Sequence, residues 1–312
     1  MNIQQFQYVL AVVDSKNFEN AADRCFVTQS TLSTMIGRFE SEIGIKIFNR
    51  RTKPVSITPE GQHIISRLRI IQNEIEQLGN MVQELKDEMV GELRIGIIST
   101  IAPYLLPRFL PEFAKRFPKV KTIVKEIPTA QIQKDLKDRN LDVGILAIPI
   151  GDHELVEQEL YTEPFLIYDC KEGNAKRKIA VTELDYSKLW LLQEGHCLRT
   201  QVYHICERSN LSPKNDLNFE FESGSMDSLL RFTKGNKGIT ILPYLAALDL
   251  PETDRSDLVA FESPVPVRSI GLLTHKDFVR KQLLQELNKV IRESVNGLIP
   301  DEGSIDVVNP LK

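Results

Sequence analysis

The stretch VTQSTLSTMIGRFESEIG, residues 27–44, decides what kind of domain opens this chain. Its apolar residues recur at helical spacing and form one stripe: Val27, Leu32, Ile36, Phe39 and Ile43. Thr28 stands where a helix cap belongs. The other face carries Gln29, Ser30, Thr31, Ser33, Thr34 and Arg38. Short polar side chains of this kind suit base edges in the major groove of DNA, so the stretch predicts a recognition helix.

The segments on either side complete a DNA-binding head. Residues 2–14 and 18–24 predict two helices before the recognition helix. After it, KIFNRRTKPVSIT predicts two short strands around a basic tip of Arg50, Arg51 and Lys53. Such a wing contacts phosphate or the minor groove. The alternative is a small helical domain whose polar face is simply exposed to solvent. The helix–turn–helix order followed by a basic wing instead favours a winged helix-turn-helix domain at 1–58.

A long helix is expected next, at residues 59–90. Pro59 suits its first turn, with Thr58 as the cap. A heptad seam follows, made of Ile64, Leu68, Ile71, Ile75, Leu78, Val82, Leu85 and Met89. A helix of about 30 residues spans roughly 45 Å and cannot bury that seam alone. We therefore expect it to pair with a second copy, so that two recognition helices meet an inverted-repeat DNA site.

Residues 91–300 alternate predicted strands and helices, which favours α/β architecture with open parallel sheets. The last residues, 301–312, read as a loose tail. The formal net charge of −4 gives no overall attraction to nucleic acid, so DNA binding must depend on a local basic face. The N-terminus has no signal-peptide pattern, and no run of about 18 apolar residues occurs. We expect a cytoplasmic protein without a membrane span.

Three residues with reactive or polar side chains follow predicted strands at the turns into helices: Thr100, Thr129 and Cys197. In open α/β sheets ligands bind beyond the carboxyl ends of strands, near helix N-termini. The alternative for each threonine is a helix cap. Together they predict one pocket lined by two hydroxyls and a thiol.

The stretch CLRTQVYHIC begins with Cys197 and ends with Cys206. The expected helix N-terminus and the neighbours His196 and Arg199 are features that lower the pKa of the Cys197 thiol. If 198–206 is helical, the two cysteines are about 13–14 Å apart on opposite faces. A disulfide needs Cα atoms within about 7 Å, so the bond would require the segment to unwind, which is a redox switch.

Two other interpretations of the cysteines stay open. They could be inert buried thiols, the interpretation we favour for Cys25 and Cys170. A zinc site is the second alternative, but paired Cys-x-x-Cys spacing is missing, and we predict no metal and no cofactor.

The head FENAADRCFVTQSTLSTMIGRFESEIGIKIFNR, the long helix and the α/β region resemble LysR-type transcriptional regulators along the whole chain. The resemblance implies a winged helix-turn-helix, a linker helix and a two-subdomain sensor of the periplasmic-binding-protein type. It places subdomain I at about 92–163 and 268–298 and subdomain II at about 164–267. It also implies a homodimer or homotetramer.

The run HCLRTQVYHIC resembles the signature of peroxide-sensing members of that family. The resemblance implies that Cys197 is the peroxidatic cysteine and Cys206 the resolving one. It implies peroxide-holding roles for Thr100 and Thr129, and supporting roles for His196, Arg199 and Arg268. This chain departs from the pattern at Thr200, where many relatives carry an acid, and at His204 and Ile205, where they often have Gly-Phe.

The function implied is a hydrogen-peroxide-responsive activator of oxidative-stress genes, not an enzyme. Its implied partners are double-stranded DNA, RNA polymerase, and glutaredoxin or thioredoxin as reductant. One rival is a regulator of the same family that binds a small metabolite anion in the same cleft. Another is a thiol peroxidase enzyme, which would have no use for the DNA-binding head and the heptad helix.

Overall fold

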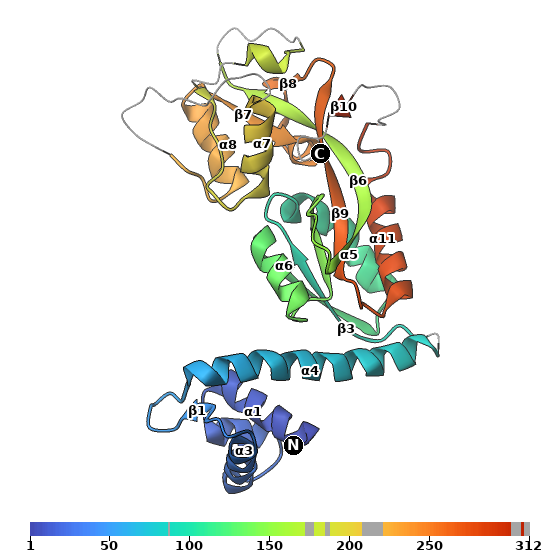
Figure 1. Cartoon of the computed structure of the whole chain (residues 1–312). Helices are drawn as coiled ribbons and strands as arrows, with labels where there is room; N and C mark the ends of the chain where they lie inside the picture. Colours follow the sequence, from blue (N-terminus) through green and yellow to red (C-terminus); the bar gives the residue numbers. More distant parts are fainter. Residues whose placement is uncertain (87, 172–177, 185–187, 208–220, 301–306, 309–312) are drawn as a thin grey trace. The chain divides into compact units, whose positions relative to one another are not determined.

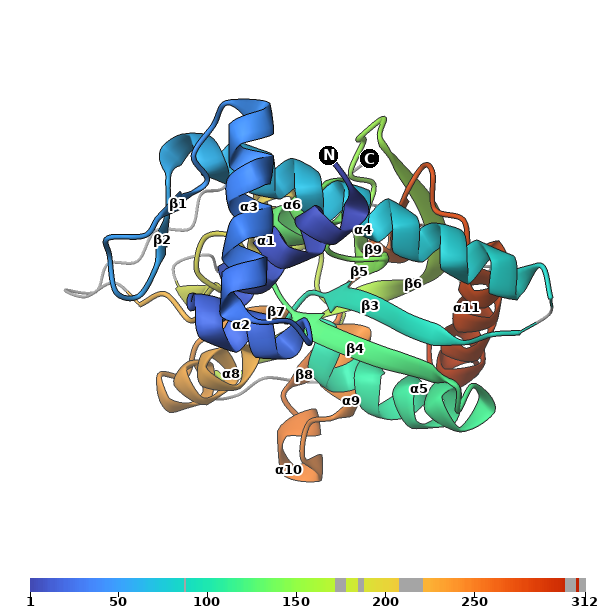
Figure 2. The ribbon, with the colours of Figure 1, turned by 90° about the horizontal axis from the view of Figure 1, so that it is seen from below.

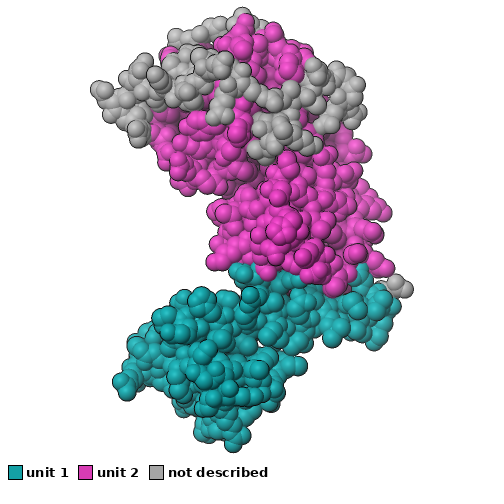
Figure 3. All heavy atoms as spheres, in the orientation of Figure 1, with its two compact units in different colours: residues 1–88, 138–140 teal, residues 89–137, 141–312 magenta. Residues whose placement is uncertain are grey.

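The computed structural model describes residues 1–86, 88–171, 178–184, 188–207, 221–300 and 307–308. The chain forms two compact units, coloured separately in Figure 3. Unit 1 contains residues 1–88 and 138–140, and unit 2 contains residues 89–137 and 141–312. Each unit is described by itself.

Unit 1 begins with three helices, α1 (Ile3–Ser15), α2 (Phe18–Arg24) and α3 (Gln29–Ile43). Side chains of Asn2, Asn17 and Thr28 cap their N-termini, which is why each helix starts where it does. Strands β1 (Phe48–Asn49) and β2 (Ser56–Ile57) then pair as an antiparallel hairpin, seen beside α3 in Figure 2. The predicted winged helix-turn-helix is confirmed.

Helix α4 (Pro59–Glu84) starts at Pro59 with Thr58 as its cap, as predicted, and is a few residues shorter than expected. Gly61 is required near its start, because a Cβ there would lie 2.5 Å from the Ile47 carbonyl oxygen. The first turns bury Ile65 and Leu68 in the core of unit 1. Farther along, the seam residues Ile71, Leu78, Val82 and Leu85 are exposed in the single chain.

The sheet of unit 2 has the path β4-β3-β5-β9-β6-β7. Its strands are β3 (Gly91–Ile97), β4 (Val120–Glu126), β5 (Val143–Ile148), β6 (Leu155–Asp169), β7 (Ile239–Pro243), β8 (Leu258–Ala260) and β9 (Val265–His275). Along this path, β3 pairs parallel with β4 and β5, whereas β9 and β6 pair antiparallel with their neighbours. The expectation of open parallel sheets therefore holds for β3, β4 and β5 and is wrong for β6, β7 and β9. Strands β6 and β9 are long and run antiparallel, side by side, through the unit (Figure 1).

The helices of unit 2 are α5 (Ala102–Arg116), α6 (Thr129–Lys137), α7 (Cys197–Glu207), α8 (Met226–Gly235), α9 (Tyr244–Leu248), α10 (Glu252–Arg255) and α11 (Lys281–Val295), with a 3-10 turn at Val181–Glu183. The helix considered at 198–206 is confirmed within α7, which ends at Glu207. Around residues 188–193 the chain makes isolated β-bridges, from Leu189 to Ile239 and from Leu192 to Ser223.

The described apolar residues of unit 2 form two cores. One joins the β3–β5 part of the sheet to α5, α6 and α11, with Phe109, Ile132 and Leu287 fully buried. The other surrounds α7, α8 and β7 and contains Trp190 and Cys206. The subdomain boundaries inferred from the sequence stay a prediction. The predicted loose tail lies mostly outside the described residues, but strand β10 (Val307–Val308) pairs parallel with β9, contrary to that expectation. No helix among the described residues is long and apolar enough to cross a membrane.

Candidate functional site

A pocket of about 220 Å³ lies where β3 and β4 end and α7 begins. It brings together four residues predicted from the sequence: Thr100, Thr129, His196 and Cys197. The rest of its lining is Ile98, Ser99, Glu126, Ile127, Pro128, Gln193, Glu194, Gly195 and Gly224. The carboxyl ends of two neighbouring parallel strands supply both threonines, so the convergence follows from the sheet.

Cys197 is the first residue of α7, and its thiol is free and partly buried. Burial raises its pKa above the ordinary value of 9.0, and this effect is larger than the opposing one of the Arg268 guanidinium. The hydroxyls of Thr129 and Thr100 also act to lower the pKa. The lowered pKa expected from the sequence is wrong in sign, because the buried site disfavours the thiolate.

The Thr129 hydroxyl has hydrogen-bonding capacity to spare. Its oxygen is buried and makes no well-aligned hydrogen bond to any of the described residues. It nevertheless lies near enough to the Cys197 thiol to affect its pKa. A buried hydroxyl without a good partner beside a thiol suits a small hydrogen-bonding ligand placed between them.

Arg268 on β9 is held behind the pocket by a buried ion pair with Glu163 on β6. Arg268 Nε and Nη2 lie 2.9 and 2.8 Å from Glu163 Oε1. Arg268 Nη1 donates to Thr100 Oγ1 at 3.3 Å, and Nη2 donates to the Thr100 carbonyl at 3.2 Å. The other oxygen of Glu163 accepts from the Leu245 N–H at 2.7 Å. Glu163 was not predicted, although an acid directly before the mostly apolar run PFLIY, residues 164–168, is a signal that could have found it.

Arg199 and His196 do not supply positive charge to the thiol. Arg199 Nη1 donates to the Leu192 carbonyl at 2.8 Å and to Glu222 Oε1 at 3.1 Å, and its guanidinium lies over the Tyr203 ring. His196 Nδ1 lies 3.1 Å from Ser99 Oγ, and burial lowers the pKa of the imidazole. The sequence predicted that both residues lower the pKa of the Cys197 thiol. Neither is among the groups that shift this pKa, which are Arg268, the hydroxyls of Thr129 and Thr100 and the backbone of Leu198, besides burial.

Cys206 is fully buried in the second core, ten residues into the helix that Cys197 begins. Neither Cys197 nor Cys206 is part of a disulfide. With α7 intact, nine residue steps of 1.5 Å separate them by about 13–14 Å, which is too far for a disulfide. The other two cysteines are also partly buried and free, and burial raises the pKa of Cys25 and raises that of Cys170 to about 11.

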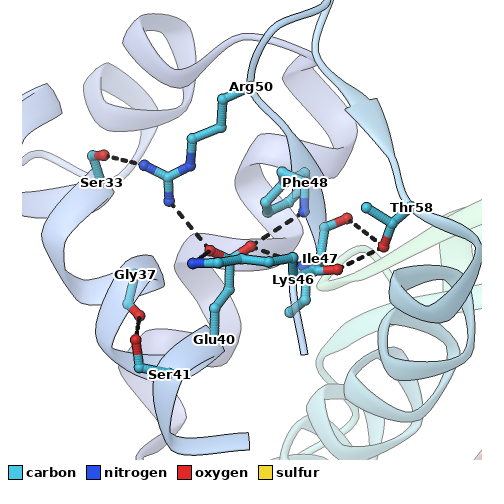
Figure 4. Close-up of polar contacts among 9 residues, drawn as sticks. All are labelled: Ser33, Gly37, Glu40, Ser41, Lys46, Ile47, Phe48, Arg50 and Thr58. Atoms are coloured by element: carbon cyan, nitrogen blue, oxygen red, sulfur yellow. Dashed lines mark hydrogen bonds and ion pairs between the residues drawn. The ribbon is translucent and has the colours of Figure 1, made fainter. Parts of the chain in front are cut away.

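The predicted DNA-binding residues lie on α3 and on the hairpin that follows it. Those exposed to solvent are Gln29, Ser30, Thr31, Thr34, Arg38, Arg50, Arg51 and Lys53, whereas Ser33 is partly buried. Arg50 differs from the two other basic residues of the wing, because it donates to Ser33 Oγ at 2.7 Å and faces Glu40 at 3.5 Å (Figure 4). Glu40, buried on α3, was not singled out by the sequence.

Within the described part of the chain, no group of three or more His, Cys, Asp or Glu side chains could hold a metal ion.

Residues 3–62 match the bacterial regulatory helix-turn-helix protein family, lysR, and residues 86–296 match the LysR substrate binding domain. The DNA-binding transcriptional dual regulator OxyR of Escherichia coli K12 is 32% identical over 301 residues, covering 95% of this chain and 97% of that protein. The regulator EstR of Acinetobacter baylyi is 30% identical over 88% of this chain and 91% of its own length.

Among solved structures, a full-length OxyR variant of Pseudomonas aeruginosa matches with a TM-score of 0.75 at 27% identity. That match covers 94% of this chain and 98% of the solved chain. The likeness therefore includes both the head and the α/β region. The chain belongs to the LysR family of transcriptional regulators and, within it, is similar to the OxyR proteins over almost its whole length.

Proposed function

We propose that this protein is a hydrogen-peroxide-responsive transcriptional regulator, an activator of oxidative-stress genes, switched by a disulfide between Cys197 and Cys206. One observation carries the proposal. The Cys197 thiol shares a small pocket with Thr100 and Thr129, and a second cysteine, Cys206, lies in the same helix, out of its reach and not in a disulfide. Several relatives are named hydrogen peroxide-inducible genes activators, which supports the same function.

In the first step, peroxide occupies the pocket and the Cys197 thiolate attacks one of its oxygens. A sulfur–oxygen bond forms, the O–O bond breaks, and hydroxide leaves to take up a proton as water. The hydroxyls of Thr100 and Thr129 can donate to the oxygen on which charge develops, as an oxyanion hole does. Arg268 favours the thiolate that starts the reaction.

In the second step, the Cys206 thiol attacks the sulfur of the Cys197 sulfenic acid. The disulfide forms and water leaves. Because an intact α7 keeps the cysteines about 13–14 Å apart, the helix has to unwind first. We propose that this rearrangement moves an interface between subunits and changes the spacing of the DNA-binding heads, so that RNA polymerase is recruited. Glutaredoxin or thioredoxin then restores the thiols.

The exposed seam of α4 supports a homodimer, assembled further into a homotetramer. Ile71, Leu78, Val82 and Leu85 are exposed in the single chain, and burying such a stripe against a second copy is favourable. Two heads in one dimer suit an inverted-repeat DNA site in the cytoplasm. The polar face of α3 and the exposed Arg51 and Lys53 are the groups proposed to contact it.

The pocket does not favour a metabolite anion as effector. Two carboxylates, Glu126 and Glu194, line it, and the nearby Arg268 is already paired with Glu163. Its volume of about 220 Å³ is also below the roughly 300–1,000 Å³ of ordinary small-molecule sites. A regulator, rather than a peroxidase enzyme with turnover, also accounts for the helix-turn-helix head.

The test is a mass-spectrometric thiol count of the full-length protein before and after stoichiometric hydrogen peroxide, handled anaerobically. We expect the loss of two hydrogen masses and a peptide pair that joins Cys197 to Cys206. The variant Cys206→Ser should instead accumulate a sulfenic acid on Cys197, which dimedone traps. Cys25→Ser and Cys170→Ser are matched controls that should react as the unchanged protein does. Thiols that survive a few equivalents of peroxide would refute the switch.

A further inference from the structure

The buried side of helix α7 contains a glutamine, Gln201, whose amide group has no hydrogen-bond partner (Figure 1 shows the helix). Four other side chains of this helix are 0–2% exposed and pack in the second core: Leu198, Val202, Ile205 and Cys206. Gln201 is 0% exposed as well. Its amide oxygen and its amide nitrogen are both buried, and neither has a partner among the described residues. An unsatisfied amide thus lies inside the helix that carries both cysteines.

Helix geometry places Gln201 within the buried side and not at its border. Successive residues turn by about 100°, so position 201 lies about 40° around the axis from Cys197 and about 60° from Leu198. It is four residues after Cys197 and five before Cys206. Gln201 is not among the residues that line the pocket of Cys197. Its amide therefore reaches solvent only when α7 opens or leaves its core.

The cost of this arrangement is large for a single side chain. A buried polar group without a partner has lost its hydrogen bonds to water and gained none in return, which shifts an equilibrium by about 5- to 150-fold. Other buried polar side chains near the same core avoid this cost. Thr233 on α8 is 0% exposed and donates to the Leu229 carbonyl at 2.8 Å. Thr240 on β7 is 1% exposed and donates to the Trp190 carbonyl at 2.9 Å.

We propose that Gln201 holds α7 close to unwinding, so that oxidation of the cysteines can open the helix. When α7 unwinds, the amide meets water and recovers its hydrogen bonds, which stabilises the open state relative to the intact helix. Gln201 thereby opposes the apolar side chains around it, which favour the intact helix. The inference rests on the proposed disulfide switch. It gives Gln201 a role in setting how readily that switch operates, separate from the binding of peroxide.

The variant Gln201→Met isolates the polarity of the side chain. Met and Gln are both unbranched and have nearly equal helix propensity, so the substitution changes little besides the amide. Gln201→Leu is a second variant with the same helix propensity, and peroxide does not oxidise its side chain. Thr233→Val is the matched control. It also makes a fully buried polar residue apolar, but it removes a hydroxyl that has a partner.

Hydrogen exchange of the reduced full-length protein measures the opening of α7 without any redox chemistry. Mass spectrometry of α7 peptides should show exchange about 10-fold slower in Gln201→Met than in the unchanged protein, the effect of removing one unsatisfied group. Thr233→Val should not slow exchange in α7. Equal or faster exchange in Gln201→Met would overturn the inference, because the amide would then be satisfied in the intact helix, as by a buried water. If circular dichroism shows that Gln201→Met is unfolded, Gln201→Leu decides.

Redox titration in glutathione buffers connects the helix to the switch. Because the intact helix belongs to the reduced state, we expect the equilibrium constant for disulfide formation to fall about 10-fold in Gln201→Met. This corresponds to a reduction potential about 30 mV more oxidising. Thr233→Val should keep the potential of the unchanged protein. A potential that is unchanged or more reducing in Gln201→Met would overturn the inference.

The rate of the first chemical step separates this role from one in the pocket. In a Cys206→Ser background, peroxide should convert Cys197 to the sulfenic acid at the same rate with and without Gln201→Leu. A 10-fold slower first step together with unchanged helix exchange would assign Gln201 to the pocket chemistry and overturn the inference. No disulfide in the unchanged protein after peroxide would refute the proposed function. A normal disulfide with unchanged exchange in Gln201→Met would overturn the inference alone.

Discussion

At the scale of single residues, the reactivity of Cys197 depends on two opposing effects on its pKa, burial and the positive charge of Arg268. Burial is the largest effect on its pKa and raises it, while Arg268, 71 positions later in the chain, acts in the opposite direction. At neutral pH only a small fraction of the thiol is therefore ionised in the reduced fold. Because the thiolate is the nucleophile, the rate of its chemistry is limited by that fraction.

A pH dependence follows from the direction of the shift. The thiolate fraction rises with pH and reaches one half only above the ordinary pKa of 9.0, because the pKa of Cys197 is raised. We expect the rate of iodoacetamide alkylation at Cys197 to increase about tenfold per pH unit from pH 6 to 8 and still to rise at pH 9. Peptide mapping by mass spectrometry measures this rate. A plateau reached below pH 8 would contradict the raised pKa.

Thr129 permits a test of transition-state stabilisation. Thr129→Val removes a hydroxyl that faces the thiol and keeps the shape of the side chain. We expect the rate of peroxide oxidation at Cys197 to fall about 10²–10³-fold, as on loss of one oxyanion-hole donor. Stopped-flow kinetics measure it. Thr122→Val on β4 is the control, since Thr122 is another buried hydroxyl without a partner and does not line the pocket. Equal rates for both variants would exclude the role of Thr129.

At the scale of elements, α7 is the part that the proposed switch has to unfold. It carries both cysteines, and its apolar face, including Leu198 and Val202, is buried in the second core. In the first turn of α7, Arg199 donates hydrogen bonds to the Leu192 carbonyl and the Glu222 carboxylate. The contacts of this helix therefore stabilise the reduced state, and the proposed disulfide would have to form at the expense of those contacts.

A substitution of the exposed residue Thr200 can test whether the stability of α7 affects the reduction potential. Thr200→Ala raises helix propensity by roughly 0.6 kcal/mol without changing a buried contact. Because the helix belongs to the reduced state, we expect the reduction potential to become more oxidising by about 10–15 mV. Redox titration in glutathione buffers measures the potential. Gln285→Ala, at an exposed position of α11, should leave it unchanged. A shift toward more reducing values would mean that oxidation does not unwind α7.

At the scale of the whole molecule, a single chain leaves apolar side chains of α4 exposed to solvent. Leu78 is 61% exposed and Leu85 76% exposed on α4, an apolar stripe that a single copy leaves in water. The heptad spacing of the stripe accounts for this, because it matches a second helix better than it matches a globular core.

Leu78→Asp should therefore prevent dimerisation. A carboxylate in the middle of the paired seam would be buried without a partner, which is costly. We expect sedimentation velocity at micromolar concentration to show monomers, and binding to an inverted-repeat duplex to weaken at least 100-fold through loss of the second head. Asn80→Asp adds the same charge on another face of α4 and should stay dimeric. A dimeric Leu78→Asp protein would place the interface elsewhere.

Local order in this protein was set by the sequence. The start of α3 at Thr28, the start of α4 at Thr58 and the helical course of Cys197–Glu207 were all predicted, because caps, periodicity and propensity act between residues a few positions apart. The incompatibility of an intact α7 with a disulfide followed from helix geometry alone.

Tertiary structure decided the rest. The pair between Arg268 and Glu163 joins residues 105 positions apart, and the hydrogen bond from Arg50 to Ser33 joins residues 17 positions apart. The hydrogen bond from the Arg199 side chain to Leu192 and the antiparallel pairing of β6 with β9 also depend on the folded chain. The physical reason is that a long side chain selects among several partners by distance and burial, which depend on elements brought together from far along the chain.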